Sequence, residues 1–183
     1  MNQQKVILIV GPSGVGKTSA YQAIQERFPN CVARHLDGLA SDWAVELGWF
    51  PVASVSLLRS HINDDQLFLA FGLESIGMLA SRNPQMHLVI DVGAGFQDAR
   101  SAENLHRIHD VISITADPLV VYRRICNHRG EKRSFEDYKA QEFSERRIKV
   151  YSQTRHLIDT SSLSLRDTAD RLTSIIQKLI RVK

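Results

Sequence analysis

One segment near the start of the chain carries the residue types needed to hold a polyphosphate. Residues 11–18 read GPSGVGKT, the G-x-x-x-x-G-K-[ST] pattern of a phosphate-binding loop, or P-loop. The apolar run VILIV at residues 6–10 precedes it and a predicted helix follows, as the pattern requires. Glycines let successive N–H groups curl round one anion, and the start of the helix adds positive charge.

The motif assigns separate tasks to its last residues. Lys17 can reach the β- and γ-phosphates of a nucleotide, and the Thr18 hydroxyl can hold Mg²⁺. A Gly-rich turn between a strand and a helix is the simpler reading, but strand, lysine, threonine and helix together favour a nucleotide site. The predicted nucleotide-binding residues are Ser13, Gly14, Val15, Gly16, Lys17, Thr18 and Ser19.

Two aspartates stand at the ends of predicted strands, where an open α/β sheet places its ligands. Asp37 ends the second strand and could orient or deprotonate a substrate hydroxyl, or simply form a turn before Gly38. Asp91 ends the most apolar predicted strand. In P-loop nucleotide-binding proteins, an aspartate at the end of such a strand holds Mg²⁺. Its alternative role is to cap the next turn. We favour the metal role for Asp91 because the P-loop needs a metal partner.

Three further segments carry candidate contacts. The turn 93–95, Gly-Ala-Gly, could let backbone N–H groups approach a ligand or could be a plain tight turn. Arg129, Lys132 and Arg133 could form a mobile lid over about 127–137 that brings positive charge onto a transferring phosphoryl group, or a solvated basic loop. Arg147 lies in an Arg-rich helix, where surface ion pairing is the alternative role.

Strand and helix patterns alternate along the chain. Strands are predicted at 5–10, 31–36, 87–92, 111–116 and 156–159. Helices are predicted after the P-loop to about residue 28, from 64 to 83, at 101–108, from 117 to about 127, as one long polar helix at 135–153, and from a capping box at 164–167 onward. Residues 43–61 give only weak helix signals. The alternation predicts one α/β domain over residues 1–183, with a parallel sheet of about five strands and helices on both faces.

Composition limits the classes of function. Of the 183 residues, 43% are apolar and 23% charged, and the net charge of +3 suits small anionic ligands without requiring nucleic acid. No apolar run approaches the ~18 residues of a membrane span. Cys31 and Cys126 have no metal-ligand spacing, and no secretory leader pattern is present. We therefore expect free thiols in a cytoplasmic protein that binds a small-molecule substrate, with no nucleic-acid or membrane partner.

Over nearly its whole length the chain resembles the shikimate kinases, small P-loop kinases that phosphorylate a hydroxyl of shikimate with ATP. The resemblance rests on the P-loop, on residues 93–109 and on the segment from Asp117 onward. It implies the three-layer P-loop NTPase fold and several roles. Asp37 would be the substrate-binding and catalytic acid, Ala94 and Gly95 would also bind substrate, Arg124 would pack on adenine, Arg133 would be the lid arginine with Arg129 as the competing match, and Arg147 would grip the substrate carboxylate.

The sequence departs from the family at three places. His35 stands where the family has an aspartate that helps to hold Mg²⁺ through water, Phe71 stands at the expected position of a second substrate arginine, and the Gly-Gly-Gly turn has become Gly-Ala-Gly. The resemblance therefore predicts ATP- and Mg²⁺-dependent phosphorylation of a small carboxylated metabolite, with shikimate as the leading acceptor. Another small-molecule kinase of this fold and a non-catalytic ATP-binding module are the alternatives.

Overall fold

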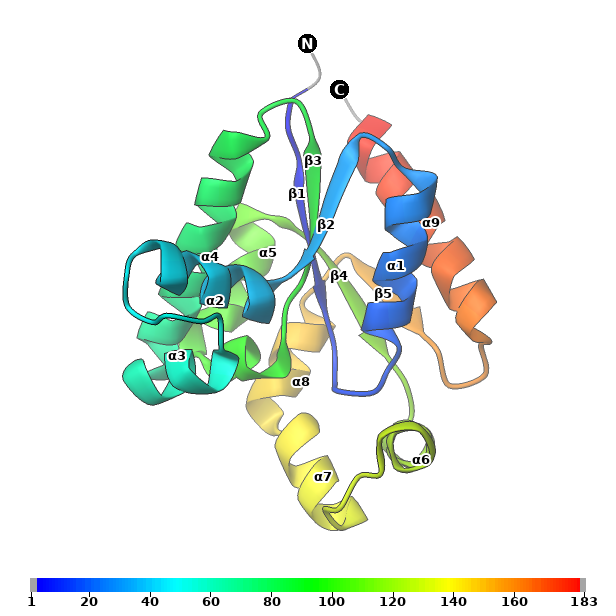
Figure 1. Cartoon of the computed structure of the whole chain (residues 1–183). Helices are drawn as coiled ribbons and strands as arrows, with labels where there is room; N and C mark the ends of the chain where they lie inside the picture. Colours follow the sequence, from blue (N-terminus) through cyan, green and yellow to red (C-terminus); the bar gives the residue numbers. More distant parts are fainter. Residues whose placement is uncertain (1–2, 182–183) are drawn as a thin grey trace.

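A parallel sheet of five strands forms the centre of the computed structural model, which describes residues 3–181 without the side chains of residues 20 and 129 (Figure 1). The strands are β1 (Val6–Val10), β2 (Cys31–His35), β3 (His87–Asp91), β4 (Asp110–Thr115) and β5 (His156–Asp159). Their spatial order is β2-β3-β1-β4-β5, and every neighbouring pair is parallel. The carboxyl ends of β2, β3 and β1 therefore lie next to one another at one edge.

Helices connect the strands. The α-helices are α1 (Lys17–Arg27), α2 (Leu36–Glu46), α3 (Val55–His61), α4 (Asp65–Arg82), α5 (Leu105–Ile108), α6 (Pro118–Arg129), α7 (Phe135–Glu142), α8 (Glu145–Ser152) and α9 (Leu165–Arg181). Two short 3₁₀ helices, η1 (Ala94–Asp98) and η2 (Arg100–Asn104), follow β3. In Figure 1, α2, α3, α4 and α5 lie on one side of the sheet, whereas α1 and α9 lie on the other.

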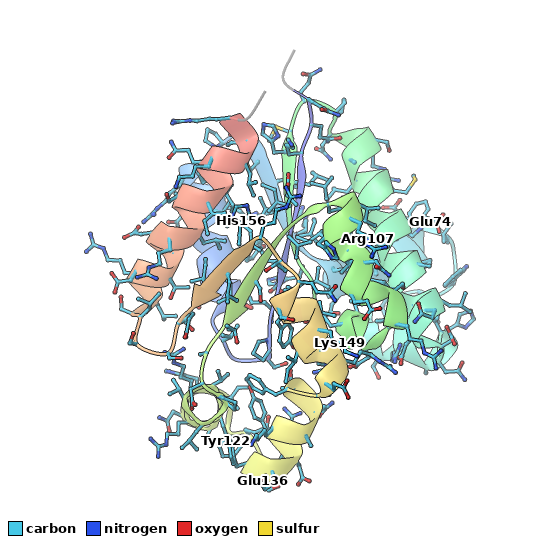
Figure 2. The ribbon with its side chains drawn as sticks, turned by 180° about the vertical axis from the view of Figure 1, so that it is seen from behind. Glu74, Arg107, Tyr122, Glu136, Lys149 and His156 are labelled. Atoms are coloured by element: carbon cyan, nitrogen blue, oxygen red, sulfur yellow. The ribbon has the colours of Figure 1, made fainter. Side chains whose placement is uncertain are left out.

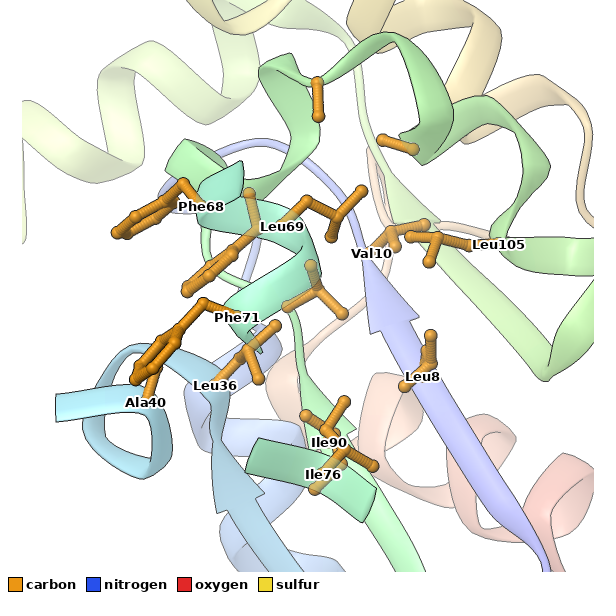
Figure 3. Packing of buried hydrophobic residues seen from close by; sticks show 14 of the residues in the cluster. Leu8, Val10, Leu36, Ala40, Phe68, Leu69, Phe71, Ile76, Ile90 and Leu105 are labelled. Carbon is orange, nitrogen blue, oxygen red and sulfur yellow. The ribbon is translucent and has the colours of Figure 1, made fainter. Parts of the chain in front are cut away.

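Alternating side chains of the strands build two hydrophobic cores. Leu8, Val10, Leu88 and Ile90 point to the core that α2 and α4 cover, where Phe68 stacks on Phe96 with ring centroids 4.2 Å apart. Figure 3 shows this cluster from close by. The neighbouring strand residues, such as those at 7, 9 and 89, point instead to the core beneath α1 and α9. A sheet buried on both faces explains the near-continuous apolar runs of β1 and β3.

Several helix starts agree with the sequence signals. Asp117 caps α6 by accepting from the Leu119 amide at 2.9 Å, with Pro118 in the first turn. Ser164 and Asp167 cap α9 reciprocally, because each side chain accepts from the backbone amide of the other. Both predicted starts are confirmed, as is the predicted parallel sheet with helices on both faces.

Two local predictions were wrong, and one stretch with only weak signals is largely helical. β2 ends at His35 and α2 begins at Leu36, so Asp37 lies in the first turn of a helix and not in a turn after a strand. The weakly predicted stretch 43–61 contains the end of α2 and all of α3. The long polar helix is two helices: α7 ends at Glu142, and Ser144 caps α8 by accepting from the Arg147 amide at 3.4 Å.

Both cysteines are free thiols, and burial raises the pKa of Cys31 to about 11. Within residues 3–181, none of the helices has the length and hydrophobicity needed to pass through a lipid bilayer.

Two glycines of α4 should respond oppositely to alanine. A Cβ atom on Gly72 would lie 2.6 Å from a ring carbon of Phe96, whereas one on Gly77 would meet nothing within 4 Å. Gly72→Ala should therefore destabilise the fold by about 1–3 kcal/mol through overpacking. Gly77→Ala should stabilise it by roughly 0.5–1 kcal/mol through helix propensity. Urea unfolding of both variants tests this, and equal effects would contradict the described packing of Phe96.

Candidate functional site

A cavity of about 530 Å³ opens at the carboxyl ends of the strands. It brings together the P-loop, the ends of β2 and β3, one face of α6 and the start of α9. The lining residues are Ser13, Gly14, Val15, Gly16, Lys17, Thr18, Ser19, His35, Asp37, Asp91, Gly93, Ala94, Arg124, Ile125, His128, Leu163, Leu165 and Thr168. All seven predicted P-loop residues thus face one space together with Asp37 and Asp91, which are distant in the sequence.

Close packing shapes the P-loop. Gly11 adopts φ of 147°, and a Cβ atom there would overlap the backbone oxygen of Ile114 at the end of β4. The loop returns to α1 at Gly16, which is left-handed with φ of 100°. Lys17 Nζ donates to the carbonyl oxygens of Gly11 at 2.8 Å and Pro12 at 3.0 Å. The lysine is only 8% exposed, so its charge is held against the loop itself.

Three titratable side chains gather beside the P-loop. His35 and Asp91 are direct partners in the register of β2 and β3, and His35 Nδ1 lies 3.1 Å from Asp91 Oδ2. Asp37 lies in the first turn of α2 and packs on Gly93, where an added Cβ would lie 2.5 Å from each carboxylate oxygen. The absence of a side chain at residue 93 is therefore what lets the Asp37 carboxylate occupy this position.

The pKa values of His35 and Asp37 are both raised. The hydrogen bond to Asp91 raises the pKa of His35 above its ordinary value, and the negative charges of Asp91 and Asp37 add to the effect. Burial raises the pKa of Asp37, and the nearby Asp91 charge raises it further. A raised pKa makes Asp37 a stronger base once ionised, which suits it to receive a proton from an acceptor hydroxyl.

The same residues offer oxygen ligands to a hard cation. Asp91 Oδ1 is buried and, among the described atoms, has no hydrogen-bond partner, while Thr18 lines the cavity from the start of α1. The described part of the chain contains no cluster of three His, Cys, Asp or Glu side chains that could hold a metal by themselves. The residues therefore fit an ion such as Mg²⁺ that takes only one or two protein oxygens and completes its shell with phosphate and water.

The opposite wall of the cavity suits a nucleoside. Arg124 is fixed by Thr160, donating to its carbonyl oxygen at 2.7 Å and its hydroxyl at 3.1 Å. Ile125 and His128 continue this wall along α6. Leu163, just before α9, and Leu165, at its first residue, complete it. Of these wall residues, only Arg124 was assigned from the sequence. The apolar wall residues carry no motif in the sequence.

The basic segment after α6 lies outside the cavity lining. Arg133 pairs with Glu131, with Nη2 2.6 Å from Oε2, and its guanidinium sits 5.3 Å from the Tyr138 ring centroid. The paired Glu131 has its pKa lowered to about 2, first by this hydrogen bond. To reach a phosphate, Arg133 would have to leave Glu131. The backbone of Arg129 ends α6, but its side chain lies outside the described residues.

Of the residues predicted to contact the acceptor, some line the cavity and others do not. Ala94 lines the cavity, whereas Gly95 does not and instead faces Phe68. Arg147 is 2% exposed and forms a bidentate bond to Asp98, with both distances 2.7 Å. Its remaining nitrogen, Nη1, lies 2.9 Å from Glu142 Oε2. Phe71, where an arginine was expected, is buried and stacks on Trp49.

Sequence reasoning missed two residues that touch the P-loop. Glu142 accepts from the Ser13 amide at 2.9 Å, and Tyr138 Oη donates to the Ser13 carbonyl at 2.7 Å. They are four residues apart in α7 and therefore share one face of the helix. That spacing could be seen in the sequence, but the element it would meet could not.

Comparison with solved structures identifies the class of fold, that of the P-loop kinases of small molecules. Shikimate kinase from Bacteroides thetaiotaomicron is similar, with a TM-score of 0.70 and 17% identity over 94% of this chain and 98% of that one. Shikimate kinase from Acinetobacter baumannii, solved in complex with shikimate, gives 0.63 and 18% over 100% and 97%. A gluconokinase from Sinorhizobium meliloti 1021 gives 0.56 and 14% over 98% and 95%.

The particular architecture is that of the shikimate kinases: a five-stranded parallel sheet with helices on both sides. No protein-family model matches the sequence, and no curated relative does. At these identities the likeness establishes the fold of the chain, and the chemistry has to be argued from its own residues.

The His35–Asp91 pair should make stability depend on pH. Because the folded pKa of His35 is raised, its contribution is present below the pKa of a free imidazole and is lost as pH rises through the folded value. In metal-free buffer, the loss of unfolding free energy in His35→Asn should be larger near about pH 5.5 than near about pH 8.5.

His87 provides the matched control. Burial lowers its pKa, so its contribution should fall as the pH drops below the ordinary value for histidine. His87→Asn should therefore show the opposite trend in the same denaturation series. A pH-independent effect of His35→Asn would mean that the pair with Asp91 is not charged in the folded protein.

Proposed function

We propose that the protein transfers the γ-phosphoryl group of ATP to a hydroxyl of a small metabolite. The observation that supports this most strongly is that the P-loop with Lys17 shares one cavity with Asp37, Asp91 and Arg124. It combines a phosphate cradle, a candidate base and a nucleoside wall within one space. Phosphoryl transfer needs little more than such positioning and charge stabilisation.

Each residue has a defined task in this proposal. The P-loop amides and Lys17 hold the phosphate chain, and Arg124 with its apolar neighbours holds the adenine. Asp37 orients the acceptor hydroxyl and takes its proton as the bond to phosphorus forms. Arg133 reaches the phosphoryl group after leaving Glu131. Thr18 and Asp91 would hold Mg²⁺, which when bound neutralises phosphate charge.

Shikimate is the first acceptor to test, because it is the acceptor that the sequence resemblance implies. Arg147 is the proposed carboxylate contact, yet its guanidinium already pairs with Asp98 and Glu142. An acceptor carboxylate would need to displace Asp98, whose side chain is 34% exposed. A neutral hydroxylated acceptor would not need to displace Asp98. Comparing an acid with its own ester therefore distinguishes carboxylated from neutral acceptors.

The proposal is tested by acceptor-stimulated ADP release. Shikimate, its methyl ester, gluconate and neutral polyols are added at saturating concentration with ATP and Mg²⁺, and phosphorylated products are identified by mass spectrometry. At least one acceptor should stimulate release. Lys17→Ala should lower that rate on the order of a hundredfold or more, since it removes charge stabilisation in the transition state.

Arg171→Ala, an exposed change on α9 outside the cavity lining, serves as the control and should leave the rate unchanged. ATP binding without transfer to any acceptor would contradict the proposed reaction and favour a non-catalytic nucleotide-binding module. Near-normal turnover in folded Lys17→Ala would contradict the assignment of the P-loop.

A further inference from the structure

Helix α7 holds both backbone groups of one P-loop residue. The amide of Ser13 donates to Glu142 Oε2 over 2.9 Å, and Tyr138 Oη donates to the Ser13 carbonyl over 2.7 Å. Tyr138 is fully buried and Glu142 is 3% exposed, so water competes weakly for either bond. Neither residue lines the cavity. We call this pair of contacts the α7 clasp.

Glu142 also connects the P-loop to two arginines. Its Oε2 atom, which accepts from Ser13, lies 2.9 Å from Arg147 Nη1, and its Oε1 atom lies 3.7 Å from Arg133 Nη1. Arg147 in turn holds Asp98 at the end of η1. One carboxylate thus joins the phosphate loop to the basic lid segment on one side and to the 3₁₀ helix after β3 on the other.

The surroundings of α7 keep this carboxylate in place. Tyr138 packs against Tyr122 of α6, with ring centroids 5.5 Å apart, and Tyr122 donates to the Arg133 carbonyl at 2.7 Å. Figure 2 shows α6, α7 and α8 together at the base of the molecule, with Tyr122, Glu136 and Lys149 labelled on them. A buried carboxylate is costly without partners, and here two guanidiniums and a backbone amide offset that cost.

We propose that Glu142 is a positioning residue, which fixes the P-loop at Ser13 and aligns Arg133 and Arg147 with it. Its task in phosphoryl transfer rests on the proposed function, whereas its hold on the P-loop backbone does not. The clasp anchors α7 to the P-loop. Any lid movement of the basic segment is therefore confined to the residues that precede Ser134, the N-cap of α7.

Two variants and a matched control test the clasp. Glu142→Gln retains an oxygen for the Ser13 amide but removes the charge that faces the arginines. Tyr138→Phe removes the bond to the Ser13 carbonyl and retains the ring. The control is Glu145→Gln on α8, since the Glu145 side chain is 87% exposed and pairs with Lys149. Amide hydrogen exchange of the peptide 11–16 is measured in the intact nucleotide-free protein, with the melting temperature and the ATP dissociation constant.

Glu142→Gln should speed exchange at Ser13 and weaken ATP binding, each by about tenfold. Tyr138→Phe should speed exchange at the same amide, and Glu145→Gln should change neither quantity. A lower melting temperature in Glu142→Gln with native exchange at Ser13 and native ATP affinity would show a merely structural ion pair and overturn the proposal. If that variant does not fold, Glu142→Asp replaces it, because the shorter side chain keeps the charge but withdraws the carboxylate from Ser13; native exchange at Ser13 and native ATP affinity in Glu142→Asp overturn the proposal.

The exchange measurement also separates this inference from the proposed function. If no acceptor is phosphorylated by the native protein, phosphoryl transfer fails as a function. The exchange rate at Ser13 still decides whether α7 holds the P-loop.

Discussion

The close contact between Gly11 and the end of β4 sets the course of the P-loop. Because Gly11 has no Cβ atom, its backbone can pass directly beside the Ile114 carbonyl oxygen as it leaves β1. The loop then turns back, so that Lys17 Nζ donates to the Gly11 carbonyl. The sheet order then places β3 directly beside β1, and β2 on the far side of β3. Asp91 at the end of β3 and Asp37 at the start of α2 therefore reach the same cavity as the phosphate loop.

Charge balance around the loop is the second constraint. Lys17 is buried against backbone carbonyls, Asp91 is buried beside His35, and Arg147 is buried between two carboxylates. In each case a group that would be costly alone is placed next to a complementary dipole or charge. Asp37 differs, since burial and the Asp91 charge both oppose its ionisation. Such an unfavourably placed acid is typical of functional sites.

Much of the fold, and the gathering of the P-loop with Asp37 and Asp91 at one cavity, could be predicted from the sequence. The P-loop pattern, the apolar strands and the caps at Asp117 and Ser164 are local signals, and each was confirmed by local geometry. The placement of Asp91 followed from strand-end reasoning in the same way. The break at Ser144 was missed because a helix-capping serine inside a polar helical pattern has a weak signal of its own.

The contacts that could not be predicted join segments far apart in the chain. Glu142 and Ser13 are 129 residues apart, and nothing in the pattern of α7 indicates which element its buried face meets. Arg147 shows the converse: its position in the motif predicts a ligand contact, but only the fold reveals that Asp98 and Glu142 already surround it. Pairings of this kind depend on topology, which single-sequence patterns specify poorly.

The central claim is that the cavity holds a nucleotide by its phosphate chain. Calorimetric titration of the protein with ATP, ADP and AMP in the presence of Mg²⁺ tests it most directly. If the P-loop amides and Lys17 hold the β-phosphate, ATP and ADP should bind, and AMP should bind at least about thirtyfold more weakly, an effect of roughly 2 kcal/mol. AMP binding as tight as that of ADP would contradict the account, because the nucleoside wall would then carry the affinity without the loop.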